Sequence, residues 1–372
     1  DIEVADYESF TLDNGMQVFV VEDPNMPSVT FNMDVNRPPI RSGKKSGYTQ
    51  LAGQVLGTAT ENRSKDELNE AIDFIGASLS TSSTGFYASA LKKHHEKLLQ
   101  LSADVIKNPV FKQEEFEKQQ KQLISSVKSS ENSPGAIAGR VYNRLLFGKD
   151  HPYGDIRSVE TVENVSLDDV KNYYQQYFDP SISYLAVVGN VTKEEIKPLV
   201  KEEFGDWKSD GQPPEKDYET PQPAEERKVA VVNRSAAEQS TLRIGHPVDL
   251  QLNDSAYFAA RLANTILGSP NFRLFMNLRE DKAYTYGAYS SIDADEEVGS
   301  FTASAEVSND ATDSAVKEVL KEMRQIRSEG VTADELERAK SYITGNFAIG
   351  LEDARTVARY ALNIAHNDLP ED

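Results

Sequence analysis

The chain contains no cysteine in its 372 residues, which excludes disulfides, thiolate metal ligands and a cysteine nucleophile together. It has one tryptophan and five histidines, so imidazole chemistry has few candidates. No apolar run approaches the roughly 18 residues of a membrane-spanning helix. Basic residues are in the minority, 40 against 60 acidic ones, giving a formal net charge of -20. We therefore expect no membrane span and no nucleic-acid partner, because such a charge repels phosphate-rich surfaces.

The length and one proline-rich segment indicate two domains. A chain of 372 residues is too long for one ordinary domain and natural for two. Residues 209–227 hold four prolines among Gly, Asp, Glu and Lys, a composition typical of an exposed connector. We expect an N-terminal domain over 1–208, a hinge-like linker over 209–227 and a C-terminal domain over 228–372.

Strand and helix signals occur in both halves. Asp13-Asn14-Gly15 between two apolar runs predicts a β-hairpin, and the alternation over residues 29–35 predicts a half-buried strand. Ser64-Lys65-Asp66-Glu67 is a capping box, which predicts a helix that Gly76 ends. After the linker, Val229-Ala230-Val231-Val232 predicts a new strand.

The second half repeats parts of the first. Segments 52–58, 86–90 and 115–118 match 263–269, 301–305 and 335–338, at offsets of 211, 215 and 220. Three matches in one order favour a duplicated domain, the alternative being a chance alignment of generic patterns. Adding 220 to residues 167–188 leads beyond Asp372. We expect a second domain without its last helix and strand: a shortened chain, a proteolysed product, or a sheet that a partner completes.

Gln50 and Gln54 are four residues apart, so they share a face if this segment is helical. A His-x-x-Glu-His sequence there would supply two zinc ligands and a general base, but the three positions read Gln50, Gly53 and Gln54. Neutral amides are poor zinc ligands, and glycine cannot accept a proton from metal-bound water. Taken alone, such a glutamine pair is most often a solvated helix face.

With its neighbours, this segment resembles the insulinase/pitrilysin-like zinc peptidases, or inverzincins, which run Gly-x-x-His-x-x-Glu-His before apolar residues and Gly-Thr. The chain keeps Gly47 ahead of the three positions and Val55-Leu56-Gly57-Thr58 behind them. The likeness covers most of the chain, roughly 1–208 and 228–372, and extends to His151-Pro152-Tyr153-Gly154 and to residues 184–190.

The resemblance also implies a third zinc ligand, a glutamate roughly 75–80 residues after the second histidine. From Gln54 that window reaches Glu131, and a further acidic position of the family falls at Ser126. A lone Glu131 would not hold zinc; its alternative interpretation is a carboxylate in a loop or at a helix end.

A second motif keeps its residues. Family members carry a pattern like Leu-Arg-Glu-x-x-Gly-x-x-Tyr, and here Arg279 and Tyr286 occupy the Arg and Tyr positions while Ala283 replaces the Gly. The resemblance implies that this pair binds substrate at the zinc site of a facing domain. A guanidinium and a phenol O–H can hold a substrate carbonyl and oppose its developing negative charge. In the alternative, Arg279 pairs with a neighbouring carboxylate and Tyr286 is a core aromatic.

Other chemistries find no support. The adjacent His94 and His95 would diverge on a helix, and His246 before Pro247 is interpreted as structural. The sequence contains no Gly-x-Ser-x-Gly elbow, no P-loop and no Gly-x-Gly-x-x-Gly.

We therefore expect an α+β protein of two homologous domains, each a mixed or antiparallel sheet with helices packed on one side, facing each other as a clamshell. As the resemblance implies, it would be a non-catalytic subunit or half of an insulinase-like zinc metallopeptidase that cleaves peptides. No catalytic residue, metal or other cofactor is expected in this chain; zinc belongs to the catalytic partner.

Alternatives stay open at this point. The chain could be a structural scaffold or peptide-binding protein of the same fold, or an enzyme with a rewired metal site. It could also pair with a second copy of itself. The resemblance favours the periplasm or cell envelope, with the cytoplasm as the other option.

Overall fold

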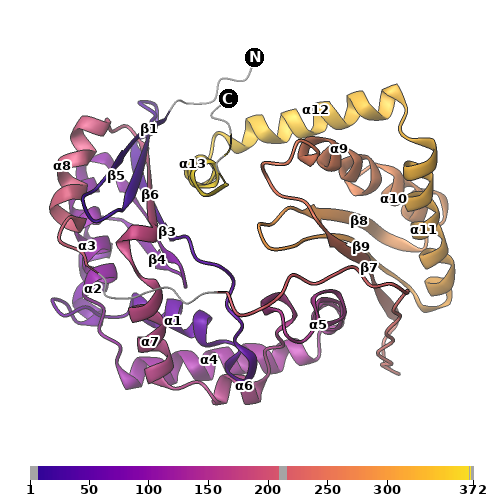
Figure 1. Ribbon diagram of the computed structural model, residues 1–372, viewed down its shortest axis with the longest axis horizontal. Coiled ribbons are helices and arrows are strands. Elements are labelled where there is room, and N and C mark those ends of the chain that lie inside the picture. The colour runs from indigo at the N-terminus through magenta and orange to yellow at the C-terminus, as the bar shows by residue number, and fades with distance from the viewer. Residues whose placement is uncertain (1–6, 209–215, 368, 370–372) are drawn as a thin grey trace. The chain divides into compact units, whose positions relative to one another are not determined.

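The computed structural model describes residues 7–208, 216–367 and 369 (Figure 1). Over these residues the chain forms two compact units, each with helices around a β-sheet, which confirms the predicted α+β class. Residues 209–215 of the expected linker lie outside the described residues, and residues 216–227 form neither helix nor strand. Within the described part, no helix combines the length and apolar character needed to cross a bilayer.

The first unit is built on a six-stranded sheet in the order β1-β2-β6-β3-β5-β4. Its strands are β1 (Tyr7–Thr11), β2 (Gln17–Glu22), β3 (Ser28–Val35), β4 (Ser78–Thr81), β5 (Gly85–Leu91) and β6 (Ser183–Gly189). The predicted hairpin joins β1 and β2, with Gly15 at a φ of +95° that a side chain would disfavour. Strand β6 runs parallel to β2 and antiparallel to β3, so it is the central strand between them.

The helices of the first half cover one face of this sheet. They are α1 (Tyr48–Leu56), α2 (Lys65–Phe74), α3 (His95–Lys107), α4 (Gln113–Glu131), α6 (Val159–Glu163), α7 (Leu167–Tyr177) and α8 (Lys193–Phe204). The core beneath them contains the side chains of β3 that alternate toward it, Val29, Phe31 and Met33. Each contributes about 1.5–3 kcal/mol on full burial. The capping box predicted at Ser64 is present at the start of α2.

The second unit has a three-stranded antiparallel sheet in the order β7-β9-β8. Its elements include β7 (Gln239–Val248), α9 (Tyr257–Gly268), α10 (Arg273–Phe275), β8 (Thr285–Asp293), β9 (Gly299–Ser308), α11 (Thr312–Glu329) and α12 (Ala333–Gly350), and α10 continues into a π-helical stretch, Met276–Asp281. The prediction that a strand begins at Val229 is wrong. Residues 229–232 are exposed and unpaired, and the first strand of this unit begins at Gln239.

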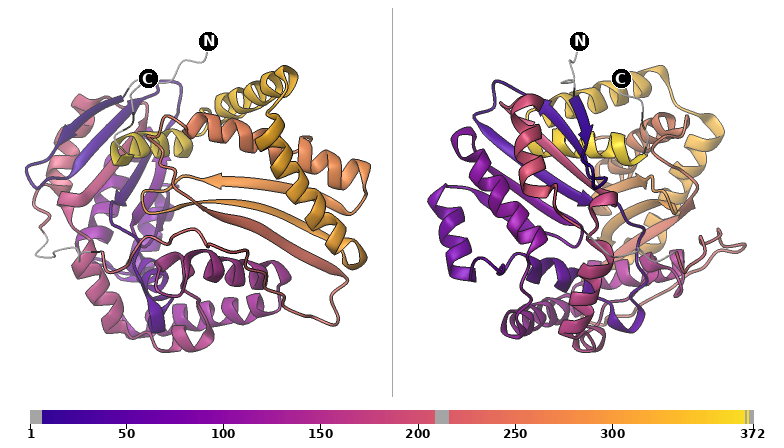
Figure 2. Two further views of the ribbon diagram at one scale, coloured as in Figure 1. Left: turned by 45° about the vertical axis from the view of Figure 1, so that its right-hand side comes forward. Right: turned by 60° about the vertical axis from the view of Figure 1, so that its left-hand side comes forward.

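The two units exchange one helix each. Helix α5 (Pro134–Phe147) belongs to the second unit, although it follows α4 in sequence, and α13 (Ala354–Asn367) belongs to the first. Figure 2 shows α5 against β7 and α13 against β6, the contacts that also define the units. The offset of 220 superimposes α4 on α12 and α5 on α13, so the exchange is reciprocal. The units therefore differ from the contiguous division into 1–208 and 228–372.

Helix α13 covers the face of the first sheet that the other helices leave open. Ala358, Ala361 and Leu362 pack on side chains of β2 and β6. The guanidinium of Arg355 lies 4.1 Å from the ring centroid of Tyr87, a cation–π contact on the same sheet. The first sheet is thus covered by helices on both faces, one set from its own half and one helix from the end of the chain.

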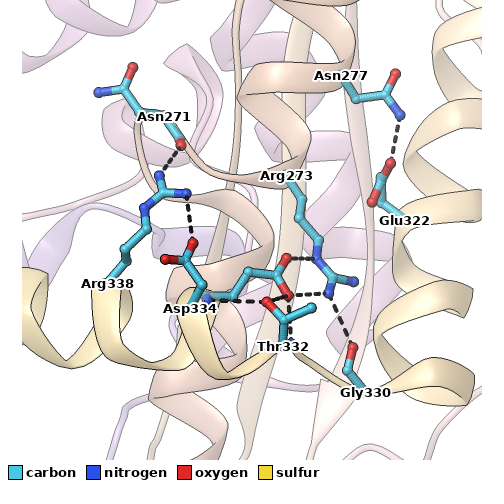
Figure 3. A network of polar contacts seen from close by, with 9 residues as sticks. Asn271, Arg273, Asn277, Glu322, Gly330, Thr332, Asp334 and Arg338 are labelled. Atoms are coloured by element: carbon cyan, nitrogen blue, oxygen red, sulfur yellow. Dashed lines mark hydrogen bonds and ion pairs between the residues drawn. The ribbon is translucent and has the colours of Figure 1, made fainter.

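A polar network fixes the start of α12 in the second unit (Figure 3). The Arg273 guanidinium donates two hydrogen bonds to the Glu335 carboxylate, at 2.6 and 2.8 Å, and one to Gly330 O at 3.1 Å. Thr332 N–H donates to the same carboxylate at 2.8 Å and caps the helix. These hydrogen bonds, first of all those from Arg273, lower the pKa of Glu335 to about 2.

We predict that Glu335→Gln lowers the free energy of unfolding by about 1 kcal/mol at pH 7, because a bidentate charged pair that is partly screened by solvent is lost. The folded-state pKa lies below the ordinary 4.5, so this contribution is present above pH 4.5 and disappears as pH falls toward 2. Denaturant unfolding at several pH values checks this. The control is Glu337→Gln on the exposed face of α12, and a wild-type advantage that persists at pH 2 would contradict it.

Candidate functional site

Gln50, Gly53 and Gln54 all lie on helix α1. Gly47 precedes the helix at a φ of +116°, and Leu51, Ala52, Val55 and Leu56 anchor its buried side. Gln50 and Gln54 keep partly exposed side chains, whereas Gly53 between them is buried. Gln50 and Gln54 thus lie on one helix, as their spacing of four residues predicts. Their surroundings, however, differ from those of a metal site.

Gly53 lies against the backbone of the turn between β4 and β5. A Cβ added to Gly53 would lie 2.4 Å from the carbonyl carbon of Ser82 and 2.5 Å from the nitrogen of Ser83. Carbon atoms in van der Waals contact are about 3.5–4.0 Å apart, so even an alanine requires the backbone to move. A glutamate at this position, the general base of an inverzincin, would require the same movement of the Ser82–Ser83 backbone.

Hydrogen bonds hold that turn against α1. Thr81 Oγ1 donates to Gly53 O at 2.8 Å. The Tyr173 hydroxyl donates to Ser83 O and accepts from Arg37 Nε at 2.8 Å. Burial raises the pKa of the Tyr173 phenol, with the Arg37 charge opposing it, so Tyr173 stays a neutral donor. These hydrogen bonds hold the Ser82–Ser83 backbone close to Gly53, an arrangement called the closure at Gly53 below.

The two glutamine amides are also unsuited to a cation. The exposed Arg157 donates from Nη1 to Gln50 Oε1, which places a positive charge beside the position of the first ligand. A guanidinium there repels a divalent ion, since like charges at short range are unfavourable. Gln54 Oε1 is buried without a hydrogen-bond partner, but one amide oxygen is not a tetrahedral ligand set.

The two acidic positions do not complete the site. Ser126 is an exposed residue of α4. Glu131 is the exposed last residue of the same helix and belongs to the second unit, while Gln50, Gly53 and Gln54 belong to the first. Across the described residues, no group of three His, Cys, Asp or Glu side chains could hold a metal ion. The donor set at α1 does not fit zinc.

Arg279 lies in the π-helical stretch that follows α10. Its guanidinium packs over the ring of Phe275, 4.7 Å from the centroid, and Nε is 3.4 Å from Glu280 Oε1. The side chain is 45% exposed. The pairing with Glu280 that the sequence left as an alternative is thus present, but it is a solvent-screened contact worth at most about 1 kcal/mol. The stacking on Phe275 orients the guanidinium without enclosing it.

Tyr286 projects from β8 into solvent, with 87% of its surface exposed. The alternative of a core aromatic is therefore wrong. The pairing of β8 with β9 shifts register between Thr285 and Ala288, and Gly287 N–H donates to Thr285 Oγ1 at 3.1 Å within this bulge. Bulges of this kind re-aim side chains and are common next to binding sites. An exposed tyrosine on a fixed bulge is suited to contact a ligand.

The backbone at Ala283 shows why the family motif has a glycine at this position, between the Arg and the Tyr. It has a φ of +55°, and its N–H bonds to Arg279 O at 3.1 Å as the helical stretch ends. Glycine is favoured in this left-handed conformation because it has no Cβ to clash. The chain keeps the backbone of the motif even with alanine, so Arg279 and Tyr286 retain the same connecting turn.

Sequence reasoning missed the residues that close the site. Ser82 and Ser83 follow a short strand and carry no motif, and Arg157 is 107 residues from Gln50 in sequence. The one sequence feature that could have predicted this contact is Gly53 itself, because a glycine within a helix often marks the close approach of another backbone.

The sequence matches two models of one peptidase family. Residues 18–146 match the model described as Insulinase (Peptidase family M16), and residues 164–343 match the one described as Peptidase M16 inactive domain. An uncharacterized zinc protease of Bacillus subtilis is 23% identical over 353 residues, covering 93% of this chain and 85% of that protein. One of Streptomyces coelicolor is 24% identical over 357 residues, covering 92% and 77%.

Solved structures share the fold. A protease from Helicobacter pylori has a TM-score of 0.89 at 21% identity, covering 99% of this chain and 91% of that one. A peptidase M16 inactive domain from Pseudomonas fluorescens has a TM-score of 0.87 at 19% identity, covering 98% and 88%.

The closure at Gly53 can be measured with two alanine substitutions. Gly53→Ala is predicted to lower the free energy of unfolding by about 1–3 kcal/mol, because its Cβ overlaps the Ser82–Ser83 backbone. Gly345→Ala on α12 is the control: its Cβ meets no atom within 4 Å, so stability should rise by about 0.5–1 kcal/mol. Equal effects of the two changes in denaturant unfolding would contradict the close approach.

Proposed function

Because the chain belongs to the insulinase family (peptidase family M16), we propose that it is the non-catalytic partner of a zinc-bearing M16 peptidase. In this role it contributes Arg279 and Tyr286 to the active site of the partner, which holds zinc on an intact His-x-x-Glu-His. The substrates are peptides. The net charge of -20 favours basic or neutral ones.

The closed position at Gly53 carries this proposal. A peptidase of this type needs a carboxylate there to deprotonate metal-bound water, and the backbone of Ser82 and Ser83 occupies the volume it would need. Arg157 on Gln50 adds a positive charge where a zinc ligand would stand. We therefore propose that the chain by itself supplies neither the general base nor the zinc site for cleavage of the peptide bond.

The second unit supports a role in substrate binding. Arg279 is stacked on Phe275 yet 45% exposed, and Tyr286 is 87% exposed. When water attacks a peptide carbonyl, its oxygen becomes negative. A guanidinium and a phenol O–H that are already oriented lower the barrier by stabilising that charge. The β-bulge between Thr285 and Ala288 sets the direction in which the Tyr286 ring leaves the strand.

The test mixes this chain with an M16 homologue from the same genome that carries His-x-x-Glu-His, and follows cleavage of a fluorogenic peptide. We expect stimulation by about tenfold or more over the homologue alone, and no cleavage by this chain alone. Arg279→Ala should lower kcat/KM of the mixture by about 100-fold, as for the loss of one oxyanion donor.

The matched control is Arg324→Ala, which removes an arginine of α11 outside the proposed binding pair and should leave the stimulation unchanged. A stable complex whose activity does not depend on Arg279 or Tyr286 would instead identify the chain as a structural scaffold. Absence of any stimulation would overturn the proposal. A periplasmic or envelope location is part of the proposal and is tested separately by cell fractionation.

A further inference from the structure

The direction of the Arg279 guanidinium depends on the aromatic ring beneath it. Phe275 lies four residues earlier, so the two side chains share a face of the helical stretch. The ion pair with Glu280 joins two half-exposed side chains and is screened by solvent. The Phe275 ring is 6% exposed and is fixed by its packing. Of these two contacts, the stacking on Phe275 is therefore the more rigid support.

Tyr289 of β8 packs on the same Phe275 ring. The two ring centroids are 6.2 Å apart and the ring planes are tilted by 48°, a geometry in which aromatic pairs attract. Both α10 and the π-helical stretch pack on β8. Arg279, Phe275 and Tyr289 thus form a row of side chains that links the helical part of the motif to the strand that carries Tyr286.

The Tyr289 phenol also covers the β-bulge. A Cβ added to Gly287 would lie 2.5 Å from Tyr289 Oη and 2.7 Å from Cε2, so the ring rests directly on the Gly287 backbone. Gly287 follows Tyr286 within the register shift between Thr285 and Ala288. A ring in close contact with this backbone restricts its movement. Tyr289 therefore contacts both the bulge that directs Tyr286 and the ring that supports Arg279.

We infer that Tyr289 is a positioning residue for Arg279 and Tyr286, acting through Phe275 on the first and through Gly287 on the second. The inference rests on the proposed function, in which these two side chains bind one substrate carbonyl. Two donors to one oxygen must keep a fixed separation, because a small misplacement of either loses much of the stabilisation. One ring that contacts both supports fixes both directions together.

The second unit contains a matched row of side chains outside the motif. The Arg338 guanidinium lies 5.0 Å from the Phe272 ring centroid, and the Phe272 and Tyr342 centroids are 5.9 Å apart. Tyr342 is 38% exposed, against 42% for Tyr289. Tyr342→Ala therefore removes the same kind of ring from the same kind of row and is the control for Tyr289→Ala.

Nuclear magnetic resonance of the arginine side chains tests the positioning in the chain alone. Tyr289→Ala should shift the Arg279 Nε–H resonance toward that of a free arginine, because the guanidinium leaves the ring current of Phe275. Gly287→Ala should shift it as well, since the added methyl group displaces the Tyr289 ring, whereas Tyr289→Phe should not. Tyr342→Ala should shift the Arg338 resonance and leave that of Arg279 in place. An Arg279 resonance unchanged in either Tyr289→Ala or Gly287→Ala would overturn the inference.

Cleavage by the mixture with the zinc-bearing homologue gives a second readout. Tyr289→Ala should lower kcat about threefold to tenfold with little change in KM, the size of one aromatic pair and the pattern of an interaction made in the transition state. Tyr289→Phe should restore kcat, and Tyr342→Ala should leave it unchanged.

The two readouts separate failure of the inference from failure of the proposed function. If Arg279→Ala lowers kcat and Tyr289→Ala does not, the positioning role is refuted while the proposed function stands. If the mixture shows no stimulation, the proposed function fails, and the Arg279 resonance alone decides whether Tyr289 positions this side chain.

Discussion

The contact between Gly53 and the Ser82–Ser83 backbone is the constraint on which the functional interpretation depends. Because of this contact, restoring the side chains of a zinc motif is not enough to restore a zinc site. No residue with a Cβ fits at position 53 without backbone movement. Thr81 and Tyr173 hold the turn in place by hydrogen bonds to Gly53 O and Ser83 O. In the first unit, backbone atoms of Ser82 and Ser83 thus occupy the volume that a glutamate side chain at position 53 would need.

In the second unit, the side chains of the Arg–Tyr motif are exposed to solvent, unlike Gly53 in the first unit. Its Arg279 and Tyr286 stay accessible on a π-helical stretch and a β-bulge, two irregular elements that fix side-chain direction without burying the side chain. Over the described residues its sheet has three strands against six, and its covering helix α5 is only partly buried. An accessible guanidinium and an accessible phenol are suited to binding a ligand rather than to bond cleavage.

Local signals in the sequence predicted much of this fold. The hairpin at 13–15, the strand over 29–35 and the capping box at Ser64 follow from contacts within a few residues, so their patterns are visible in the chain. The strand at Val229 failed because a strand needs a neighbour, and its propensity says nothing about whether one is present. The helix exchange and the contacts of Arg157 and Ser82 depend on residues far apart in sequence, which composition and spacing cannot place.

The most direct test of the closed site restores the residues of the zinc motif. In the triple variant Q50H/G53E/Q54H, the account predicts a loss of folded stability relative to Q50H/Q54H and no zinc-dependent peptide hydrolysis, because the side chain introduced in place of Gly53 would overlap the Ser82–Ser83 backbone. Unfolding curves and a peptidase assay with added zinc measure both quantities on the same samples. A stably folded triple variant that binds one zinc per chain and cleaves peptide would contradict the account.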